Sequence, residues 1–466
     1  MKLIRALIPA LAALALLPAS ADARRPSFEI AGGDPFPSAF SWKARDYVDS
    51  CPAGTLRLEV DGGKGWRARV SGRRGVGGDF RTRIRRGAGQ GVDLTFRRKR
   101  DGMARHFHVR CLPGDFPGLS FDRRRRGGAK LFMVQLPEDY AAIFNRDGVP
   151  VWWMQASNGP GDAKVLPDGT ISWDAVEGGA TVTGAFDIRS LSGRLIRTIG
   201  DDDTTDVHDI QLLPNGNYVI GEQDYRTGVD TTAFGGVPDA ALLVYEIREV
   251  TPGGDVVRSW STAEHIGLGE TGRWWPEVAS SLIYDTSHWN AVEIDGRYMY
   301  LSFRHLDAIY KVDRRTGEIV WKLGGTETPE SLEVLNDPHP HPLGGQHDVR
   351  VLPNGTITVH DNRTGLAAEA PRAERYRIDE EAGTAKLVES VGDRGIDSAR
   401  CCGSARRLPD RSWLVSWGQN PVVGAYDGDG RPIYRLSIDG SFSYRANPVT
   451  AVGTRDLRRG MDRMHP

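Results

Sequence analysis

After its first 20 residues, the sequence has no apolar run long enough to cross a bilayer, which argues against a transmembrane anchor. It also has no recognised nucleic-acid-binding motif, so we expect no nucleic-acid partner. Its four cysteines allow only three complete pairings. The net charge of -1 and the mean hydropathy of -0.41 describe a soluble chain, long enough for one large and one small domain.

The first residues have the pattern of a secretory signal. Lys2 and Arg5 precede an apolar run from about Leu7 to Ala19, and a small-x-small cleavage pattern follows at residues 21–23. We therefore expect residues 1–23 to be a signal peptide and the mature protein to be periplasmic or secreted. After signal removal, no transmembrane segment is expected.

The near-zero net charge hides a division of the chain. Residues 24–127 contain 24 Lys and Arg but 11 Asp and Glu, whereas residues 128–466 contain 34 basic and 49 acidic residues. We expect a basic N-terminal β-domain over 24–127, because the segments 55–60, 66–70, 80–85 and 104–111 alternate apolar and polar residues as strands do. The charges favour docking of this domain on the acidic remainder over binding of an anionic partner.

The cysteines fall into two pairs by position. Cys51 and Cys111 lie near the ends of the basic domain, and a bridge between them would be worth about 4 kcal/mol on the chain-entropy model. Cys401 and Cys402 are adjacent, and a disulfide between neighbouring residues is strained. The sequence leaves open whether this second pair is structural, redox-active or simply reduced.

From residue 128 onward the chain repeats a cassette of short strands around a tight turn, with turn positions at residues 169, 216, 296, 355 and 411. Four short strands per cassette are typical of propeller blades. The tail from about 420 to 455, closing against Leu131–Leu136, would supply a sixth blade. We therefore predict an all-β protein, a six-bladed β-propeller over 128–466 preceded by a small N-terminal β-sandwich-like domain. Seven blades is the alternative.

Histidine occupies the same place in three of the five cassettes. His208, His288 and His347 each stand eight residues before the turn, whereas the other two copies have Gly161 and Gly403 there. The repeat therefore does not need histidine to fold. Because the innermost strand of every blade lines the central channel, we expect the three imidazoles to converge on a shared site.

Two further polar residues point to an anion site. Asn290 lies two residues after His288, on the same face of its strand, and Arg304 ends the next strand. A guanidinium, an amide and three imidazoles make an anion-binding cavity. His305 is expected to face away from Arg304 by strand alternation, in a structural role. Three histidines could hold zinc or copper, but Arg304 would repel a cation and no carboxylate joins the repeat position, so we predict no metal.

These residues resemble the bacterial arylsulfate sulfotransferase family. The matching stretches, in chain order, are residues 208–220, His288-Trp-Asn290, Ser302-Phe-Arg304-His305-Leu, residues 309–325 and Gly345-Gln-His347-Asp348. The resemblance implies a six-bladed propeller behind an N-terminal β-domain, in the periplasm. It also implies transfer of a sulfuryl group from a small-molecule aryl sulfate donor to a phenolic acceptor, independent of the nucleotide donor PAPS and of any other cofactor.

The resemblance also implies residue roles in a ping-pong mechanism. His347 matches the nucleophile that carries the sulfo group, as a sulfohistidine, while His208, His288 and Arg304 complete the catalytic set. Asn290, Arg304 and His208 would bind the substrate oxygens.

Two other functions stay open from the sequence. One is a propeller that binds an anionic ligand without turnover. The other is a quinoprotein dehydrogenase-like enzyme, which would repeat the segment 313–321 in many blades, whereas this chain has one clear copy. The sequence does not decide whether the protein is a homodimer.

Overall fold

The computed structural model describes residues 25–71, 78–156, 159–175, 183–201, 203–366, 369–440 and 442–466. The expected signal peptide, residues 1–23, lies outside these ranges. The described chain forms two compact units, one of residues 25–86 and 92–109 and the other of residues 87–91 and 110–466. Within the described ranges, no helix is long and apolar enough to cross a membrane.

The N-terminal unit consists of two antiparallel sheets, with strand orders β1-β3-β5 and β2-β7-β6-β4. Phe28 of one sheet packs against Tyr47 and Phe107 of the other, with ring centroids 5.1 and 5.7 Å apart. The four strands predicted from alternation are all present, and the predicted bridge between Cys51 and Cys111 is confirmed. The strands are β1 (Ser27–Ile30), β2 (Asp46–Asp49), β3 (Thr55–Asp61), β4 (Trp66–Val70), β5 (Phe80–Arg85), β6 (Gly91–Arg98) and β7 (Ala104–Cys111).

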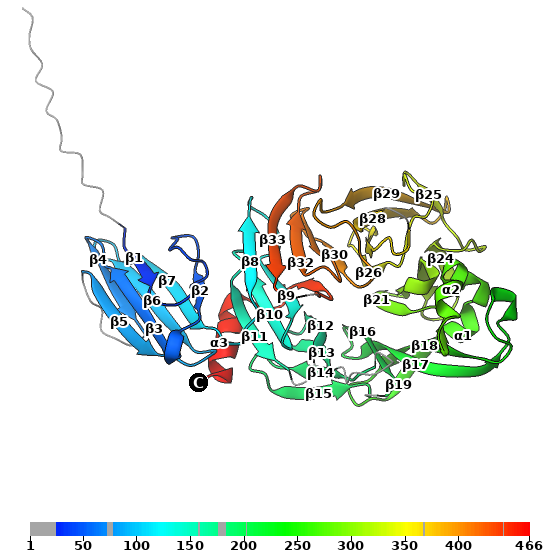
Figure 1. Ribbon diagram of the computed structural model, residues 1–466, viewed down its shortest axis with the longest axis horizontal. Coiled ribbons are helices and arrows are strands. Elements are labelled where there is room, and N and C mark those ends of the chain that lie inside the picture. The colour runs from blue at the N-terminus through cyan, green and yellow to red at the C-terminus, as the bar shows by residue number, and fades with distance from the viewer. Residues whose placement is uncertain are drawn as a thin grey trace, which may run out of the picture. The chain divides into compact units, whose positions relative to one another are not determined.

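The second unit is the six-bladed propeller that the sequence predicts. Among its described residues, six mainly antiparallel sheets are arranged around a common centre (Figure 1). Their innermost strands, β12, β16, β21, β26, β30 and β34, contact one another in a closed ring. The first three blades along the chain contain β9 (Leu131–Leu136), β10 (Tyr140–Asn145), β11 (Pro150–Gln155), β12 (Pro160–Val165), β13 (Ile171–Ala175), β14 (Phe186–Arg189), β15 (Leu195–Ile199), β16 (Thr205–Leu212), β17 (Tyr218–Val229), β18 (Ala240–Val250), β19 (Val256–Ser261) and β20 (Ile283–Asp285).

The remaining three blades follow in chain order. They contain β21 (Trp289–Asp295), β22 (Tyr298–Phe303), β23 (Ala308–Asp313), β24 (Ile319–Gly324), β25 (Glu333–Leu335), β26 (His347–Val351), β27 (Ile357–Asp361), β28 (Arg372–Asp379), β29 (Thr384–Val391), β30 (Ser404–Arg407), β31 (Trp413–Ser416), β32 (Val422–Tyr426) and β33 (Pro432–Ile438). Strands in the middle of the blades are covered on both faces, as the full burial of β10, β27 and β31 shows. Stacking of neighbouring blades therefore supplies the apolar core.

The ring closes with a strand from the end of the chain. β34 (Ala446–Pro448) pairs with β9 in the register Asn447↔Met133 and completes the blade of β9, β10 and β11. At the sixth blade, β8 (Leu119–Arg123) adds to the outer edge of β33. Residues 119–123 therefore belong to a propeller sheet, and the two units divide near residue 110 rather than near 127.

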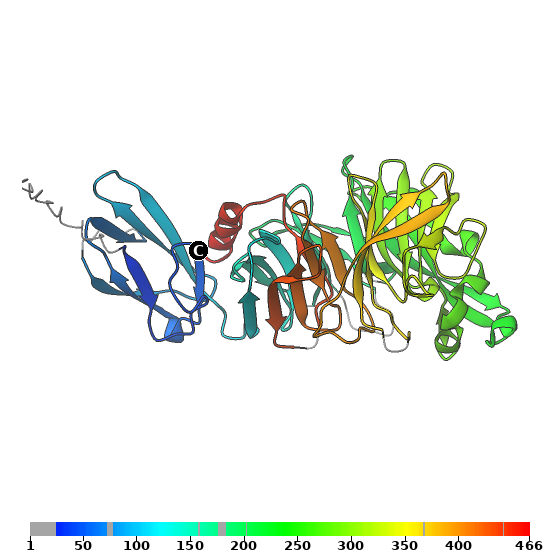
Figure 2. The same cartoon turned by 90° about the horizontal axis from the view of Figure 1, so that it is seen from above.

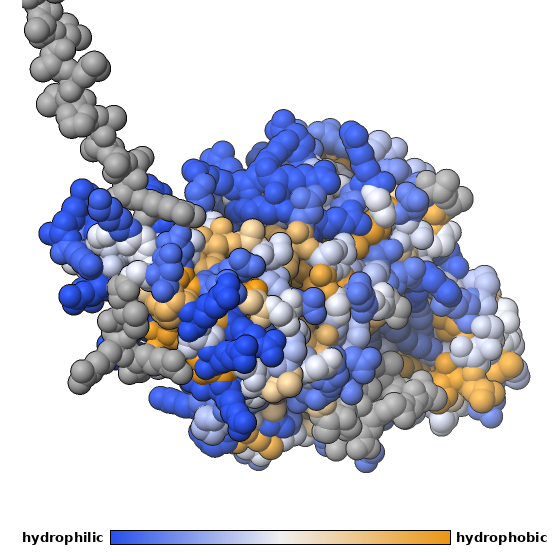
Figure 3. Space-filling model, turned by 60° about the vertical axis from the view of Figure 1, so that its left-hand side comes forward, coloured by the Kyte–Doolittle hydropathy of each residue, from blue (hydrophilic) through white to orange (hydrophobic). Residues whose placement is uncertain are grey.

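Helices, most of them short, occur in both units. η4 (Arg304–Leu306) follows β22, and α3 (Thr454–Met464) packs against β11 near the chain terminus (Figure 2). Others are η1 (Pro52–Gly54), η2 (Thr232–Phe234), α1 (Thr262–His265), η3 (Leu268–Trp274) and α2 (Trp275–Val278). The face of the molecule in Figure 3 is mainly hydrophilic, with scattered apolar areas.

Candidate functional site

The three histidines of the repeat come together in the propeller. His208 lies within β16, His288 directly precedes β21 and His347 begins β26, on three consecutive blades. The rings of His208 and His288 have centroids 5.2 Å apart and meet edge to face. His347 lies near enough to both that their positive charges would lower its pKa. The repeat therefore gathers the imidazoles as expected.

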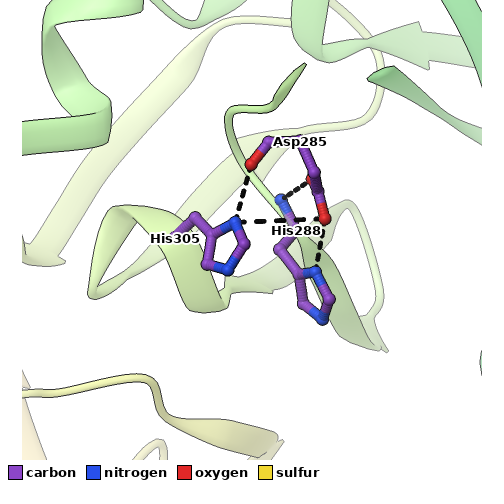
Figure 4. A group of neighbouring side chains, drawn as sticks. All are labelled: Asp285, His288 and His305. Carbon is purple, nitrogen blue, oxygen red and sulfur yellow. Dashed lines mark hydrogen bonds and ion pairs between the residues drawn. The ribbon is translucent and has the colours of Figure 1, made fainter. Parts of the chain in front are cut away.

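An aspartate orients each of the first two imidazoles. Oδ1 of Asp206 lies 2.7 Å from Nδ1 of His208, and the Asp285 carboxylate contacts Nδ1 of His288 (Figure 4). Each carboxylate also accepts the backbone N–H of its histidine at 2.9 Å. Because each Nδ1 donates its proton to the carboxylate, Nε2 is the nitrogen left for a substrate.

The third imidazole has a different set of partners. Nδ1 of His347 lies 3.1 Å from the carbonyl oxygen of Gly345 and 3.1 Å from Nδ2 of Asn362. The amide of Asn362 donates to the carbonyls of Gly345 and Cys402, at 2.8 and 3.1 Å. Nδ1 of His347 therefore donates to Gly345, and Nε2 keeps its lone pair. That lone pair accepts the backbone N–H of Cys402 at 3.3 Å.

These surroundings make the histidines chemically unequal. Burial opposes a charge on His208, but Asp206 outweighs this effect, so the pKa of His208 is raised above 6.5. Burial, followed by the positive charges of His208 and Arg304, lowers the pKa of His347 well below 6.5. Near neutral pH, His347 is thus an uncharged imidazole, while His208 retains its proton to higher pH than a free imidazole.

Arg304 stands at the end of β22, as predicted, and begins η4. Its guanidinium lies over the Trp274 ring at 4.4 Å and donates from Nη2 to the carbonyl of Arg400 at 3.1 Å. Nη1 donates to Nε2 of His305. The guanidinium thus connects the blade of His288 with the segment that carries Cys401 and Cys402.

The expectation that His305 faces away from Arg304 is wrong. The chain leaves the extended conformation after β22 and enters a 3₁₀ turn, where successive side chains no longer alternate. Nδ1 of His305 donates to the carbonyl of Asp285 at 2.6 Å, and its ring lies 4.6 Å from that of His288. Burial, together with the charge of His288, lowers the pKa of His305 to about 3. His305 is therefore a neutral ring that positions Arg304.

Asn290 contacts the residue before His347. It is fully buried, and its Nδ2 donates at 2.8 Å to the carbonyl of Gln346, the residue before His347. Its Oδ1 is buried without a hydrogen-bond partner. An unpaired buried acceptor is costly, so this oxygen is suited to accept a hydrogen bond from a ligand.

The buried guanidinium of Arg445 contacts this group of residues. Nη2 of Arg445 donates at 2.6 Å to the carbonyl of Asn290, and its Nη1 pairs with Asp162 at 3.0 Å. Asp209 lies 3.3 Å from the same guanidinium and 2.6 Å from Nζ of Lys164. These aspartates directly follow repeat positions 161 and 208, as does Asp348 after His347. That recurrent aspartate was the available sequence signal for this network.

Asp285, His288 and His305 are also three neighbouring groups of a kind that bind metals (Figure 4). Here both Nδ1 atoms act as donors, one to the carboxylate and the other to the carbonyl of Asp285. The guanidinium of Arg304 adjoins the other face of His305. The cluster therefore serves to orient His288 and Arg304, and its geometry gives no support to a cation site.

Cys401 and Cys402 border the site. Both are free thiols; Cys401 is half-buried and Cys402 is buried. The hydrogen bond to Cys402 is the main cause that lowers the pKa of Cys401 to about 7, and Arg304 contributes to it.

Fold and site together define a six-bladed β-propeller in which histidines of three consecutive blades and an arginine form one polar cluster. The chain belongs to the arylsulfotransferase (ASST) family, whose model matches residues 184–438 and so includes all five predicted site residues. No curated protein gives a significant match.

Three solved structures illustrate what the chain is similar to. A protein of unknown function from Bacteroides caccae is 12% identical, with 69% of this chain and 99% of that chain covered and a TM-score of 0.44. A catalytically inactive virginiamycin B lyase from Staphylococcus aureus is 8% identical, with 69% and 99% covered and a TM-score of 0.37. A chain of a nidogen/laminin complex is 12% identical, with 68% and 97% covered and a TM-score of 0.39. Similarity this low carries no argument about function.

Proposed function

We propose that this protein transfers a sulfuryl group from an aryl sulfate to a phenolic acceptor by a ping-pong mechanism through a sulfated His347. The observation that carries the proposal is the contrast between His347, which keeps an uncharged Nε2 lone pair, and His208, whose proton is retained by Asp206. A nucleophile and a proton donor are the two groups that sulfuryl transfer requires. Family membership supports arylsulfotransferase chemistry in general.

In the first half-reaction, Nε2 of His347 attacks the sulfur of the donor. The bond between sulfur and the aryl oxygen breaks, and the leaving oxygen takes the Nε2 proton of His208. The sulfated imidazole ring of His347 is positively charged, and the carbonyl oxygen of Gly345, 3.1 Å from Nδ1, can stabilise this charge. The phenol leaves and the sulfo group remains on His347.

The second half-reaction runs in reverse with the acceptor. Neutral His208 takes the proton of the acceptor hydroxyl, the phenol oxygen attacks sulfur, and the bond between sulfur and Nε2 of His347 breaks. As the acceptor enters, its hydroxyl would first donate its single proton to Oδ1 of Asn290, which has no hydrogen-bond partner, and would then turn it to Nε2 of His208 for the transfer. Both histidines return to their starting protonation states.

Positive groups would stabilise the sulfuryl oxygens. Sulfuryl transfer, like phosphoryl transfer, leaves the protein mostly positioning and electrostatic work. Arg304 and His288 would face the oxygens, while Arg445 supplies a fixed positive charge from below. Loss of one such preorganised group typically costs about 10²–10³ in kcat.

The direct test is to trap the intermediate. The purified protein is incubated with an aryl sulfate in the absence of acceptor, and its peptides are analysed by mass spectrometry under conditions that preserve the nitrogen–sulfur bond. We expect one equivalent of phenol and a sulfo group on His347. Phenol release without a modified His347 would contradict the mechanism, and the His347→Gln variant provides the control.

One observation favours binding without turnover as a second candidate function. The side chain of His347 is only 1% exposed and its Nε2 already accepts the N–H of Cys402. In this arrangement the nucleophile cannot reach a donor. Tight binding of aryl sulfate without phenol release would favour this candidate.

We also propose that the protein is exported. The Cys51–Cys111 disulfide supports this, because such bonds persist in oxidising compartments. N-terminal sequencing of the mature protein should give a start near Arg24, and cell fractionation should place the protein outside the cytoplasm.

A further inference from the structure

The segment that carries the adjacent cysteines covers His347. The backbone N–H of Cys402 meets Nε2 of His347, and the carbonyl of Cys402 is held by the amide of Asn362. A donor can reach the lone pair of His347 only if this N–H moves away.

The two ends of the segment are fixed. The carbonyl of Arg400 accepts hydrogen bonds from Arg304 and from Thr364, both at 3.1 Å. On the other side, the N–H of Gly403 donates to the carbonyl of Tyr444 at 2.9 Å. A local change at residues 401 and 402 would therefore turn the peptide between them without displacing its neighbours.

The thiols themselves are placed to react. They are adjacent in sequence, and Cys401 is half-buried while Cys402 is buried. Elsewhere in the same chain, Cys51 and Cys111 are oxidised. Conditions that form this first bridge would also expose Cys401 to disulfide exchange.

We propose that Cys401 and Cys402 form a redox modification site, which closes to a vicinal disulfide by exchange with an organic disulfide and thereby uncovers His347. The effect on catalysis rests on the proposed function, whereas the modification itself does not. In the reduced state the N–H of Cys402 occupies the lone pair of His347, and in the oxidised state it is turned away.

Oxidation of the cysteine pair takes place by two successive thiol–disulfide exchange steps. The thiolate of Cys401 attacks one sulfur of the external disulfide, forms a mixed disulfide and expels one thiolate. The thiol of Cys402 then loses its proton to solvent and attacks the sulfur of Cys401, which expels the second thiolate. One external disulfide is reduced to two thiols as the cysteine pair is oxidised.

Ring closure must move the peptide that covers His347. Adjacent Cα atoms are about 3.8 Å apart, below the roughly 4.4–6.8 Å that disulfides usually span. The eight-membered ring contains the peptide nitrogen of Cys402, and Cys402 already has a left-handed backbone, with φ of 70°. The bond therefore forms only with a change at this peptide, and its strain makes it easily reduced, as expected of a regulatory bridge.

The test uses the full-length protein with oxidised glutathione as the probe and dithiothreitol as the reductant. Free thiols are alkylated and the peptide with residues 401 and 402 is analysed by mass spectrometry. In parallel, selective ¹⁵N-histidine labelling follows Nε2 of His347, assigned with the His347→Gln variant. Oxidation should form the bridge, shift the Nε2 resonance and raise sulfuryl transfer about tenfold, the effect of one hydrogen bond lost.

Matched variants separate the possible outcomes. The Cys401→Ser/Cys402→Ser variant should lose the redox response, and the Cys51→Ser/Cys111→Ser variant should keep it. If the first variant does not fold, selective alkylation of Cys401 in the unaltered protein should block the response instead. Two alkylated thiols after oxidation, or a bridge that leaves the His347 resonance unchanged, would overturn the inference.

Failure of the proposed enzymatic function can be distinguished from failure of the redox modification site. A protein that transfers no sulfuryl group in either redox state, yet shows a redox-dependent His347 resonance, keeps the modification site and loses the enzymatic activity. If the protein instead transfers sulfuryl groups at an equal rate in both states, and both thiols stay free throughout, the enzymatic activity stands and the modification site is refuted.

Discussion

Replacement of His208 by glutamine removes the proposed proton donor while retaining a polar side chain of similar length. General acid catalysis typically contributes about 10²–10⁴-fold, which corresponds to roughly 2.7–5.4 kcal/mol of transition-state stabilisation. The loss depends on the leaving group, because a phenolate that is stable in water needs no proton. We expect the full loss for donors with weakly acidic phenols and little loss for nitrophenyl sulfates.

The pH dependence has a defined sign. The pKa of His208 is raised, so its acid form persists above pH 6.5 and is lost as the pH rises through that pKa. The first half-reaction with a weakly acidic phenol should therefore slow on the alkaline side. Because the pKa of His347 is lowered well below 6.5, no acid-side loss should occur near pH 6.5 from that residue. The Asp206→Asn variant should move the alkaline loss to lower pH.

The assay is kcat/KM for a series of aryl sulfates at fixed acceptor concentration, which isolates the first half-reaction of a ping-pong mechanism. In the unaltered protein, the rate should depend weakly on the pKa of the leaving phenol, and in His208→Gln it should depend steeply. A uniform loss across the series would refute the proton-donor role and make His208 a binding residue. His208→Asn serves as a second variant, with the same expected slope.

Three other predictions concern charge and stability. Arg304→Ala should lower kcat/KM by about 10²–10³ while the unfolding midpoint changes little, and near-normal turnover would show that Arg304 does not contact the sulfuryl group. Lys164→Met leaves buried Asp162 and Asp209 without their lysine and should cost about 3–5 kcal/mol in urea unfolding; an unchanged midpoint would mean that Arg445 and Arg350 compensate both carboxylates. Cys51→Ser should cost about 4 kcal/mol of stability, measured as a lowered denaturation midpoint, and an equal midpoint with and without the bridge would contradict the chain-entropy estimate.

The repeat made most of the fold predictable. The turn positions recur because each tight turn needs a left-handed residue: Gly169, Gly216 and Gly355 have φ of 84°, 87° and 76°, and Arg411 takes the same region at 64°. Because each blade reproduces the same unit, five visible turns and a C-terminal strand were enough to give six blades. The domain division was less visible, since β8 lies directly before the basic residues 124–126, which look like the N-terminal segment, but pairs with a propeller strand.

The site was predictable where it follows the repeat and hidden where it does not. His208 and His288 were found by register, but their aspartates precede them by two and three residues, because the backbone is irregular there: β16 shifts register after Asp206, and His288 has a φ of 51°. The partner of His347 on Nε2 is a backbone N–H from another blade, which no side-chain pattern reveals. Arg445 comes from the closing segment of the chain, so its proximity to Asn290 depends on ring closure.

A repeat that places three identical imidazoles at equivalent positions gives no reason for them to act differently, yet group transfer needs a base, an acid and a binding group. The difference arises from residues outside the repeat. Asp206 retains the proton on His208, whereas Gly345 offers His347 only a neutral carbonyl, so equivalent backbone positions acquire opposite protonation behaviour. A carboxylate placed beside Nδ1 of His347, as in Asn362→Asp, where the replaced amide lies 3.1 Å from that nitrogen, should therefore raise the pKa of His347 and slow its attack on sulfur.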